Sequence, residues 1–456
     1  MHIAILQIYC GASGQFGSYN CQEVGLAKAF AALGHRCTVA YPDTMAEAAE
    51  ERCVRLCPGA QALFLPAKGL GVHAFYNLDF LCRLGVDQVL LLADNHLFAP
   101  AVHRFCRAHG IACANYIGAL KSDSHSAAKR FVMDLLARRN LRCFQHSVTF
   151  AKTPAIAAML RAHGVKAQLA PVGLDLSIIP PVPGTKAQVR ARLGLAQSGL
   201  LLLYVGRLDP FKRPLDMAEV LSACPADTRL VCIGKGELSA ALARRFEELG
   251  LADRVTMIAA LPNEQVQPYY HAADAFLNFN DHEIFGMSIL EALYAGCPVI
   301  ARHAPGPDLI VQPGKTGFLV ADTAEYAPAL QRLAPAMGPA AHQSVLERFQ
   351  WKATAQTMLA KWEEAPHGSP RFFGTALARC GENHHFLQQI CRLRPAERRA
   401  GKSGHCPAPA QRRAFSGPAR RCHRNALPCR ASARRGAFFR KDPAGYFGAE
   451  RCVFQR

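Results

Sequence analysis

The sequence predicts an α/β protein built from two series of alternating strands and helices. Short apolar runs that end in glycine or polar residues recur between residues 2 and 320, with stretches of helical periodicity between them. This alternation is typical of buried parallel strands joined by crossover helices. A segment rich in proline, residues 171–183, interrupts the alternation, and a second series begins at Leu200. The chain has 456 residues, which is enough for two sizeable cores.

The first series opens with a strand–helix–strand unit. We expect a strand at 2–8, a helix at 22–33, and further strands at 37–41, 88–93 and 111–117. Gly11, Gly14 and Gly17 follow the first strand without forming a strict Gly-x-Gly-x-x-Gly, so a dinucleotide site is poorly supported.

The second series contains the stretch that predicts the chemistry, residues 280–301. A strand ends before a short loop that carries Glu283, and Gly286 opens a helix whose first turns hold Met287, Ser288 and Glu291. The free N–H groups of a first helical turn bind anions, and a glycine lets a ligand approach the backbone. This stretch therefore predicts a diphosphate site with a carboxylate on each side of a helix start.

Two cations are expected at the same site. The strand from Leu200 delivers Arg207 and Lys212 to a loop at its carboxyl end, where they could neutralise a diphosphate. The alternatives are a solvated basic loop and two glutamates on an ordinary amphipathic helix, neither of which accounts for the glycine turn between two strands.

Together these segments resemble the sugar-donor site of retaining glycosyltransferases of family four, the glycosyl transferases group 1, over roughly residues 1–364. The resemblance implies the GT-B fold, in which two Rossmann-like domains face each other across a cleft. It assigns 1–173 to an N-terminal acceptor domain, 174–349 to a nucleotide-sugar domain and 350–365 to a crossover helix, followed by a disordered Arg-rich tail at 366–456.

The resemblance also implies roles for individual residues. Glu283 would lie by the transferred sugar as a catalytic-site residue, and Glu291 would hold the ribose. The remaining residues implied to bind the sugar donor are Arg207, Lys212, Gly286, Met287, Ser288, Leu261, Gly14 and Gly17. No metal or cofactor is implied, because cations and a helix terminus supply the positive field. The sequence shows no clear second carboxylate nucleophile, so retention would proceed by front-face attack.

A catalytic histidine is less well defined. Many relatives carry one at the end of an N-domain strand, but strand 111–117 runs into Gly118 and Ala119 instead. His96 and His125 lie nearby, and we place His96 among the catalytic candidates, with a capping or surface role as the favoured alternative.

Residues 126–142 predict a basic amphipathic helix. Its apolar stripe is Phe131, Val132, Leu135 and Leu136, and its cations are Lys129, Arg130, Arg138, Arg139 and Arg142. We expect the stripe to pack on the protein's own sheet; peripheral contact with an anionic membrane is the alternative.

The charge is concentrated in the last fifth of the chain. Residues 366–456 hold 17 Arg and 2 Lys against 4 acidic residues, a net +15 of the total +19, so residues 1–365 carry only +4. Their Arg, Pro, Ala and Gly composition lacks a sustained period and predicts disorder. We therefore expect no nucleic-acid binding by the folded part.

The remaining features predict a cytoplasmic protein. No apolar run approaches a membrane span, no secretory leader precedes the first strand, and the 18 cysteines lack a small secreted framework, so no structural disulfides are expected. The enzyme would lie in the cytoplasm or at the inner face of the membrane.

The predicted function is sugar transfer from a nucleotide sugar to a carbohydrate or lipid-linked acceptor, in surface polysaccharide or glycolipid assembly. A nucleotide-sugar epimerase or another GT-B enzyme such as a phosphorylase is the alternative within the fold. A nucleic-acid-binding protein that acts through the Arg-rich tail is the alternative from another class. The donor base and the acceptor cannot be predicted, because loop contacts set specificity.

Overall fold

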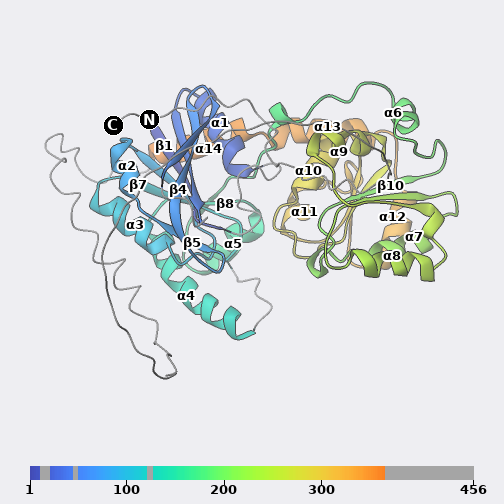
Figure 1. Ribbon diagram of the computed structural model, residues 1–456, viewed down its shortest axis with the longest axis horizontal. Helices are drawn as coiled ribbons and strands as arrows, with labels where there is room; N and C mark the ends of the chain where they lie inside the picture. Colours follow the sequence, from blue (N-terminus) through green and yellow to red (C-terminus); the bar gives the residue numbers. More distant parts are fainter. Residues whose placement is uncertain (11–20, 45–49, 121–126, 365–456) are drawn as a thin grey trace, which may run out of the picture. The chain divides into compact units, whose positions relative to one another are not determined.

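The computed structural model of the chain describes residues 1–10, 21–44, 50–120 and 127–364. These residues form two predominantly parallel β-sheets (Figure 1). The expectations for Gly14, Gly17, His125 and the segment 366–456 fall outside these described residues. The mixed α/β architecture predicted from the alternating apolar runs is confirmed.

Among the described residues, the N-terminal sheet has nine strands. In spatial order, eight of them are β3 (Arg52–Cys57), β4 (Ala60–Leu70), β2 (Arg36–Asp43), β1 (His2–Gln7), β6 (Gln88–Leu92), β7 (Ala112–Ile117), β8 (Thr149–Ala151) and β9 (Ala167–Leu169), and β5 (His73–Tyr76) pairs with β4. All pairings are parallel except those of β3 and β5 with β4. Strand β1 is buried along its whole length, as its unbroken apolar run requires.

In the part of the chain that the structure describes, five helices accompany this sheet. They are α1 (Gln22–Ala32), α2 (Asp79–Arg83), α3 (Ala99–Ala108), α4 (Ala127–Gln145) and α5 (Pro154–Ala162). Thr153 caps α5 through its side chain, which accepts a hydrogen bond from the Ile156 N–H, and Pro154 follows at the first helical position.

Within residues 127–364, the C-terminal sheet has six strands, all parallel. Their spatial order is β12 (Val255–Ile258), β11 (Arg229–Ile233), β10 (Leu201–Val205), β13 (Ala275–Asn278), β14 (Val299–Arg302) and β15 (Gly317–Val320). Its helices are α6 (Lys186–Arg192), α7 (Asp216–Ser222), α8 (Ser239–Glu248), α9 (Asn263–Ala272), α10 (Met287–Tyr294), α11 (Pro305–Ile310), α12 (Tyr326–Gln331) and α13 (Met337–Arg348). Short 3-10 turns lie at Leu176–Ile178, Pro210–Lys212, Ala252–Arg254 and Thr323–Glu325.

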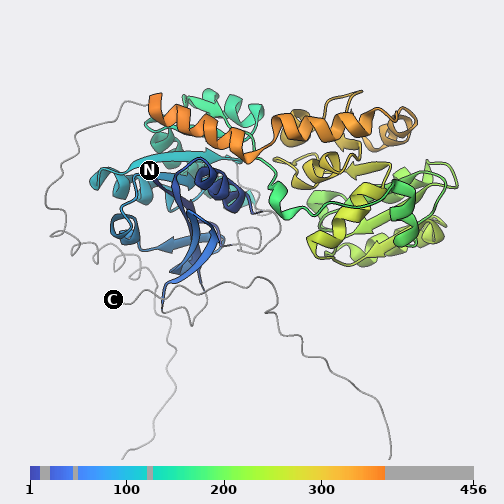
Figure 2. The same cartoon turned by 90° about the horizontal axis from the view of Figure 1, so that it is seen from above.

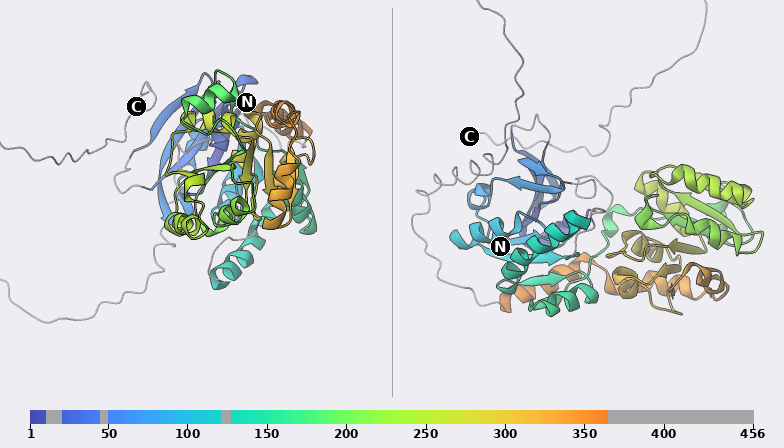
Figure 3. Two further views of the ribbon diagram at one scale, coloured as in Figure 1. Left: turned by 90° about the vertical axis from the view of Figure 1, so that its right-hand side faces the viewer. Right: turned by 90° about the horizontal axis from the view of Figure 1, so that it is seen from below.

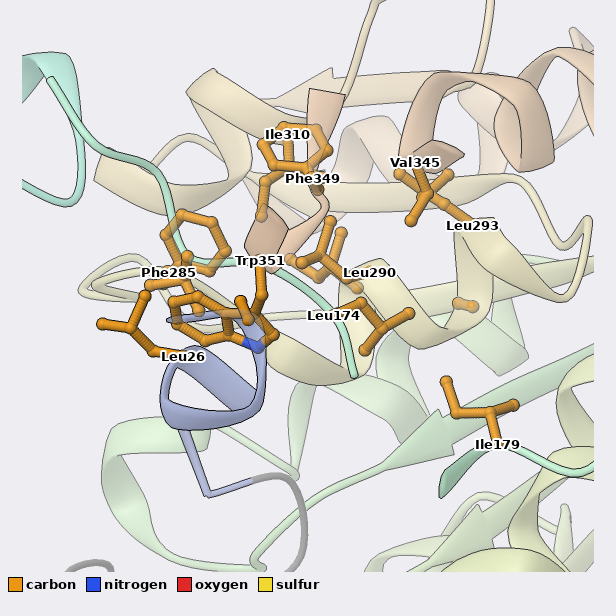
Figure 4. Close-up of a cluster of buried hydrophobic side chains, with 14 of the residues drawn as sticks. Leu26, Leu174, Ile179, Phe285, Leu290, Leu293, Ile310, Val345, Phe349 and Trp351 are labelled. Atoms are coloured by element: carbon orange, nitrogen blue, oxygen red, sulfur yellow. The ribbon is translucent and has the colours of Figure 1, made fainter. Parts of the chain in front are cut away.

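Helix α14 (Trp351–Glu364) returns from the second series to pack against α1 (Figures 1 and 2). Trp362 stacks on Phe30 of α1 with ring centroids 5.6 Å apart. At the start of α14, Trp351 lies among side chains from both series, with Leu26 on one side and Phe285 and Leu290 nearby (Figure 4). One continuous apolar cluster therefore includes α14 and residues of both sheets.

The expected packing of helix 126–142 on its own sheet is wrong for three of the four predicted residues. Phe131, Val132 and Leu135 in α4 are 72%, 52% and 49% exposed. Asn140 and Phe144 of this helix are buried instead. At 100° per residue, Phe131 and Leu135 share a face with Arg138 and Arg142, so half of the predicted apolar stripe points the same way as two of the arginines.

No helix among the described residues combines the length and the apolar character that a membrane crossing requires.

Candidate active site

The predicted glutamate loop leaves the carboxyl end of β13. Strand β13 pairs with β10, so the loop that carries Glu283 and the loop that carries Lys212 follow neighbouring parallel strands. Such loops meet at one edge of a sheet, which is where α/β proteins bind ligands. The two segments lie together because of this strand order, although 71 residues separate Lys212 from Glu283 in the sequence.

Three side chains converge on one oxygen of Glu283. Lys212 Nζ lies 2.6 Å from Glu283 Oε2, and the amides of Asn280 and Asn278 donate to the same atom at 3.2 and 3.5 Å. The Glu283 side chain is only 13% exposed. A partly buried carboxylate with a cation and two amide donors is fixed in position, which suits a group that must orient a ligand.

Local backbone interactions hold Lys212 in place. Asp209 caps the 3-10 turn 210–212 by accepting from the Lys212 N–H, and Arg213 ends that turn in the left-handed region with φ of 49°. Arg213 then pairs with Asp216 and, at 3.1 Å, with Asp281 beside the glutamate loop. Burial alone would raise the pKa of Asp281, but its bonds to His282 and Arg213 lower the pKa overall. The two loops are therefore joined by charged groups at two points.

Arg207 occupies a more open position at the end of β10. Its side chain is 74% exposed and pairs with Asp209 at 3.1 Å. The Tyr204 hydroxyl donates to the Arg207 carbonyl at 2.8 Å, which fixes the backbone and leaves the guanidinium able to move. Lys212 is thus the preorganised cation of the expected pair, and Arg207 is the adaptable one.

Helix α10 begins as the glycine turn predicts. Gly286 occupies the N-cap position with φ of 98°, and Met287 is the first residue of the helix. A Cβ at residue 286 would lie 2.8 Å from Ile289 Cδ1 and 3.3 Å from Glu283 Cγ, so a side chain would be both strained and crowded there. The first N–H groups of α10, including those of Met287 and Ser288, start beside Glu283.

Glu291 lies deeper in the same helix. It is 2% exposed, and Tyr270 of α9 donates a hydrogen bond from its hydroxyl to Glu291 Oε2 at 3.1 Å. Tyr270 is itself fully buried. The carboxylate of Glu291 is therefore held by the protein, as a group that recognises a fixed ligand atom must be.

Leu261 lies in the loop after β12, which ends at Ile258. It is partly buried against the large apolar cluster.

His96 follows β6 in a buried environment. It is 6% exposed, its Nδ1 lies 3.2 Å from Nδ1 of His73, and Tyr9 contacts its ring edge-on. Burial lowers the pKa of His96 to about 4, with the charge of His73 acting in the same direction and Asp94 opposing. A neutral, enclosed imidazole of this kind is typical of a packed histidine, whereas the sequence favoured a capping or surface role.

Three residues that support the two glutamates were missed in the sequence. Asn278 and Asn280 orient Glu283, and Tyr270 orients Glu291. The two asparagines alternate at the carboxyl end of an apolar strand, which is a detectable signal for convergent polar groups. The sequence contains no comparable signal for Tyr270, because a tyrosine in a helix that packs on a sheet is usually a core residue.

The site can bind an anion next to a hydroxylated group. Cations, two amides and a helix start surround Glu283, while Glu291 adds a second acceptor of hydrogen bonds. Within the described part of the chain, no three His, Cys, Asp or Glu side chains are grouped so as to hold a metal ion.

Comparison with known proteins gives matches over most of the described residues. The family profile for glycosyl transferases group 1 matches residues 185–334. The D-inositol 3-phosphate glycosyltransferase of Segniliparus rotundus is 32% identical over 318 residues, which cover 65% of this chain and 66% of that protein. The protein of the same name from Acidothermus cellulolyticus is 32% identical, with 69% of this chain and 73% of that protein covered.

Solved structures show the same fold at lower identity. A sucrose-phosphate synthase from Thermosynechococcus elongatus superposes with a TM-score of 0.63 at 22% identity and covers 80% of this chain and 98% of its own. Anabaena Alr3699/HepE, solved in complex with UDP and glucose, superposes with a TM-score of 0.59 at 18% identity, covering 80% and 99%.

Proposed function

Because this chain belongs to the group 1 glycosyltransferases with the GT-B fold, we propose that it transfers a sugar from a nucleoside-diphosphate sugar to an acceptor hydroxyl with retention of configuration. The relatives carry the name of an inositol phosphate glycosyltransferase, so D-inositol 3-phosphate is one acceptor that merits a test. We place the product in surface polysaccharide or glycolipid assembly.

The observation that carries this proposal is the Lys212–Glu283 pair beside the start of α10. A nucleotide sugar contains its own leaving group, so the enzyme must stabilise charge that grows on the departing diphosphate. Lys212, Arg207 and the N–H groups at 286–288 would act on that charge, and preorganised groups of this kind usually supply the largest catalytic effect.

The two glutamates would divide the remaining work. Glu283, fixed through Oε2, would bind hydroxyls of the sugar and orient its anomeric carbon for front-face attack. Glu291, fixed by Tyr270, would accept from the ribose hydroxyls. We propose that no metal takes part, since the cations and the helix start already oppose the diphosphate charge.

A panel of UDP-, GDP- and ADP-sugars tests the proposal on the full-length protein in the presence of a chelator. At least one donor should raise the melting temperature, as a ligand that binds only the native state must. That donor should then be incubated with sugars and D-inositol 3-phosphate, and the anomeric configuration of any product measured by NMR. An inverted product would refute retention.

Lys212→Ala makes the test specific to this site. Loss of a charge-assisted hydrogen bond costs about 1.5–3 kcal/mol, or roughly 10- to 150-fold in donor affinity. Lys361→Ala is the control, because Lys361 lies on α14 and, within the described part of the chain, forms its ion pair with the nearby Glu364. Equal donor affinity in both variants, or an absolute requirement for a divalent metal, would contradict the proposed site.

A further inference from the structure

The outward face of α4 carries exposed apolar side chains that the proposed reaction does not use. Phe131, Val132 and Leu135 are 72%, 52% and 49% exposed. They lie in the first half of the helix, which projects away from the N-terminal sheet in Figure 1 and in the left view of Figure 3. Apolar side chains gathered in this way mark a contact surface more often than scattered ones do.

The opposite side of α4 is anchored to the protein. Asn140 donates to the His96 carbonyl at 2.9 Å. Phe144 is 1% exposed and belongs to an apolar cluster that includes Leu91 of β6 and Leu160 of α5. Helix α4 also packs on α3. Because the buried side already has its partners, the helix cannot turn its exposed apolar residues inward without losing these contacts.

Cations continue the same face into the second half of the helix. Arg138, Arg139 and Arg142 are exposed, and α4 carries five basic residues against one acidic residue, Asp134. Helix α3, which packs on α4, adds the exposed Arg104 and Arg107 to this patch. The charges of Arg107, Arg139 and Arg104 oppose the rise in the pKa of the Cys143 thiol that burial causes.

We propose that this face of α3 and α4 docks on an anionic lipid surface. Phe131, Val132 and Leu135 would enter the boundary between headgroups and acyl chains, and Arg138, Arg139 and Arg142 would contact lipid phosphates. Charge complementarity selects this occupant: nucleic acid would match the arginines but not the apolar half. A second copy of the chain would place two equally cationic faces against each other.

A tryptophan at the tip of the face reports insertion directly. Phe131→Trp in the full-length protein should show a blue-shifted emission with vesicles of phosphatidylcholine and phosphatidylglycerol, and brominated acyl chains should quench it. The native Trp351 and Trp362 are 4% and 5% exposed and give a constant background. Met257→Trp, at a 38% exposed position on β12, is the matched control and should show no quenching.

Charge is tested by Arg138→Gln together with Arg142→Gln. Each arginine near an anionic surface is worth roughly fivefold in partitioning, so this double variant should bind such vesicles roughly 25-fold more weakly. Arg192→Gln with Arg244→Gln removes the same charge from exposed positions on α6 and α8 and should change binding far less. All variants retain the basic segment 366–456, so any binding of vesicles through that segment is common to them and cancels when their affinities are compared.

Each remaining outcome overturns the proposal. Absence of quenching at residue 131 would show that the face does not insert, and equal quenching by pure phosphatidylcholine would remove the role of the arginines. A blue shift that grows with protein concentration in the absence of lipid would show that a second copy covers the face.

Discussion

At the residue scale, the candidate site is a set of charges that are already paired before a ligand arrives. Lys212 and Glu283 lie 2.6 Å apart and are 22% and 13% exposed. Glu283 therefore cancels part of the positive field that Lys212 would present to a diphosphate. Loss of the Glu283 charge should make the site more positive, whereas loss of the Glu291 charge should remove a ligand contact.

This difference predicts opposite effects for two isosteric substitutions. Glu291→Gln should weaken the binding of the bare nucleoside diphosphate roughly 10- to 150-fold, because one charge-assisted hydrogen bond to the ribose is lost. Glu283→Gln should leave that binding unchanged or tighter and should lower turnover. Calorimetry with the diphosphate and a transfer assay measure the two effects separately.

Equal losses of diphosphate affinity in both variants would contradict the division of roles. A substitution such as Gln267→Glu is not a suitable control, because Gln267 is buried in α9 and the change would bury a new charge. Glu364→Gln on α14 removes an exposed carboxylate far from the loops and should change neither quantity.

The sequence predicted the charged residues of the site better than their supports. Glu283, Lys212 and Gly286 follow from residue type, strand ends and a glycine turn, each of which is local. The convergence of Asn278, Asn280 and Lys212 on one oxygen depends on the pairing of β10 with β13, which local patterns do not determine. His96 shows the same limit, because its partner His73 comes from an antiparallel edge strand.

At the element scale, the buried parallel strands matched their expected positions closely. Strand β6 begins at the predicted residue 88 and ends one residue before 93, because a strand covered on both faces must be an unbroken apolar run. Strands β3, β4, β5, β8 and β9 were not predicted; β3 and β5 carry no such run, and β8 and β9 are only three residues long. Helix α4 was predicted with the wrong buried side, because its sequence allows two apolar stripes.

The crossing between the two series is sensitive to a small change. Leu174 N–H donates to the Phe349 carbonyl at 2.8 Å, and the Thr354 hydroxyl donates to the Pro171 carbonyl at 2.6 Å, so the outgoing linker and the start of α14 run together. A Cβ at Gly173 would lie 2.3 Å from the backbone nitrogen of Trp351. Neither backbone can move without breaking these bonds.

We therefore expect Gly173→Ala to destabilise the protein by roughly 1–3 kcal/mol, the usual cost of overpacking. Thermal unfolding followed by circular dichroism measures the effect. Gly69→Ala is the control, because the nearest atoms to a Cβ there are side-chain atoms at 3.7 Å. A melting temperature for Gly173→Ala equal to that of the control would show that the linker can part from α14 at little cost.

At the scale of the whole molecule, charge and apolar packing separate along the chain. In the part that the structure describes, every member of the three apolar clusters lies between Ile3 and Trp362. The segment 366–456 instead holds a net +15 of the total charge of +19. Among the described residues, packing thus belongs to the two sheets and α14, and most of the charge belongs to a segment whose composition predicts disorder.

Deletion of residues 366–456 should accordingly leave the melting temperature and sugar transfer nearly unchanged. The shortened chain would carry +4 instead of +19, so any binding of the full-length protein to nucleic acid should disappear, because that binding depends on neutralised phosphates. Differential scanning calorimetry, the transfer assay and a nucleic-acid titration at two salt concentrations measure the three properties on one pair of proteins. Transfer that persists while nucleic-acid binding disappears would assign the catalytic function to residues 1–365. A collapse of folding on deletion would show that the basic segment packs on the enzyme and that the boundary at 365 is wrong.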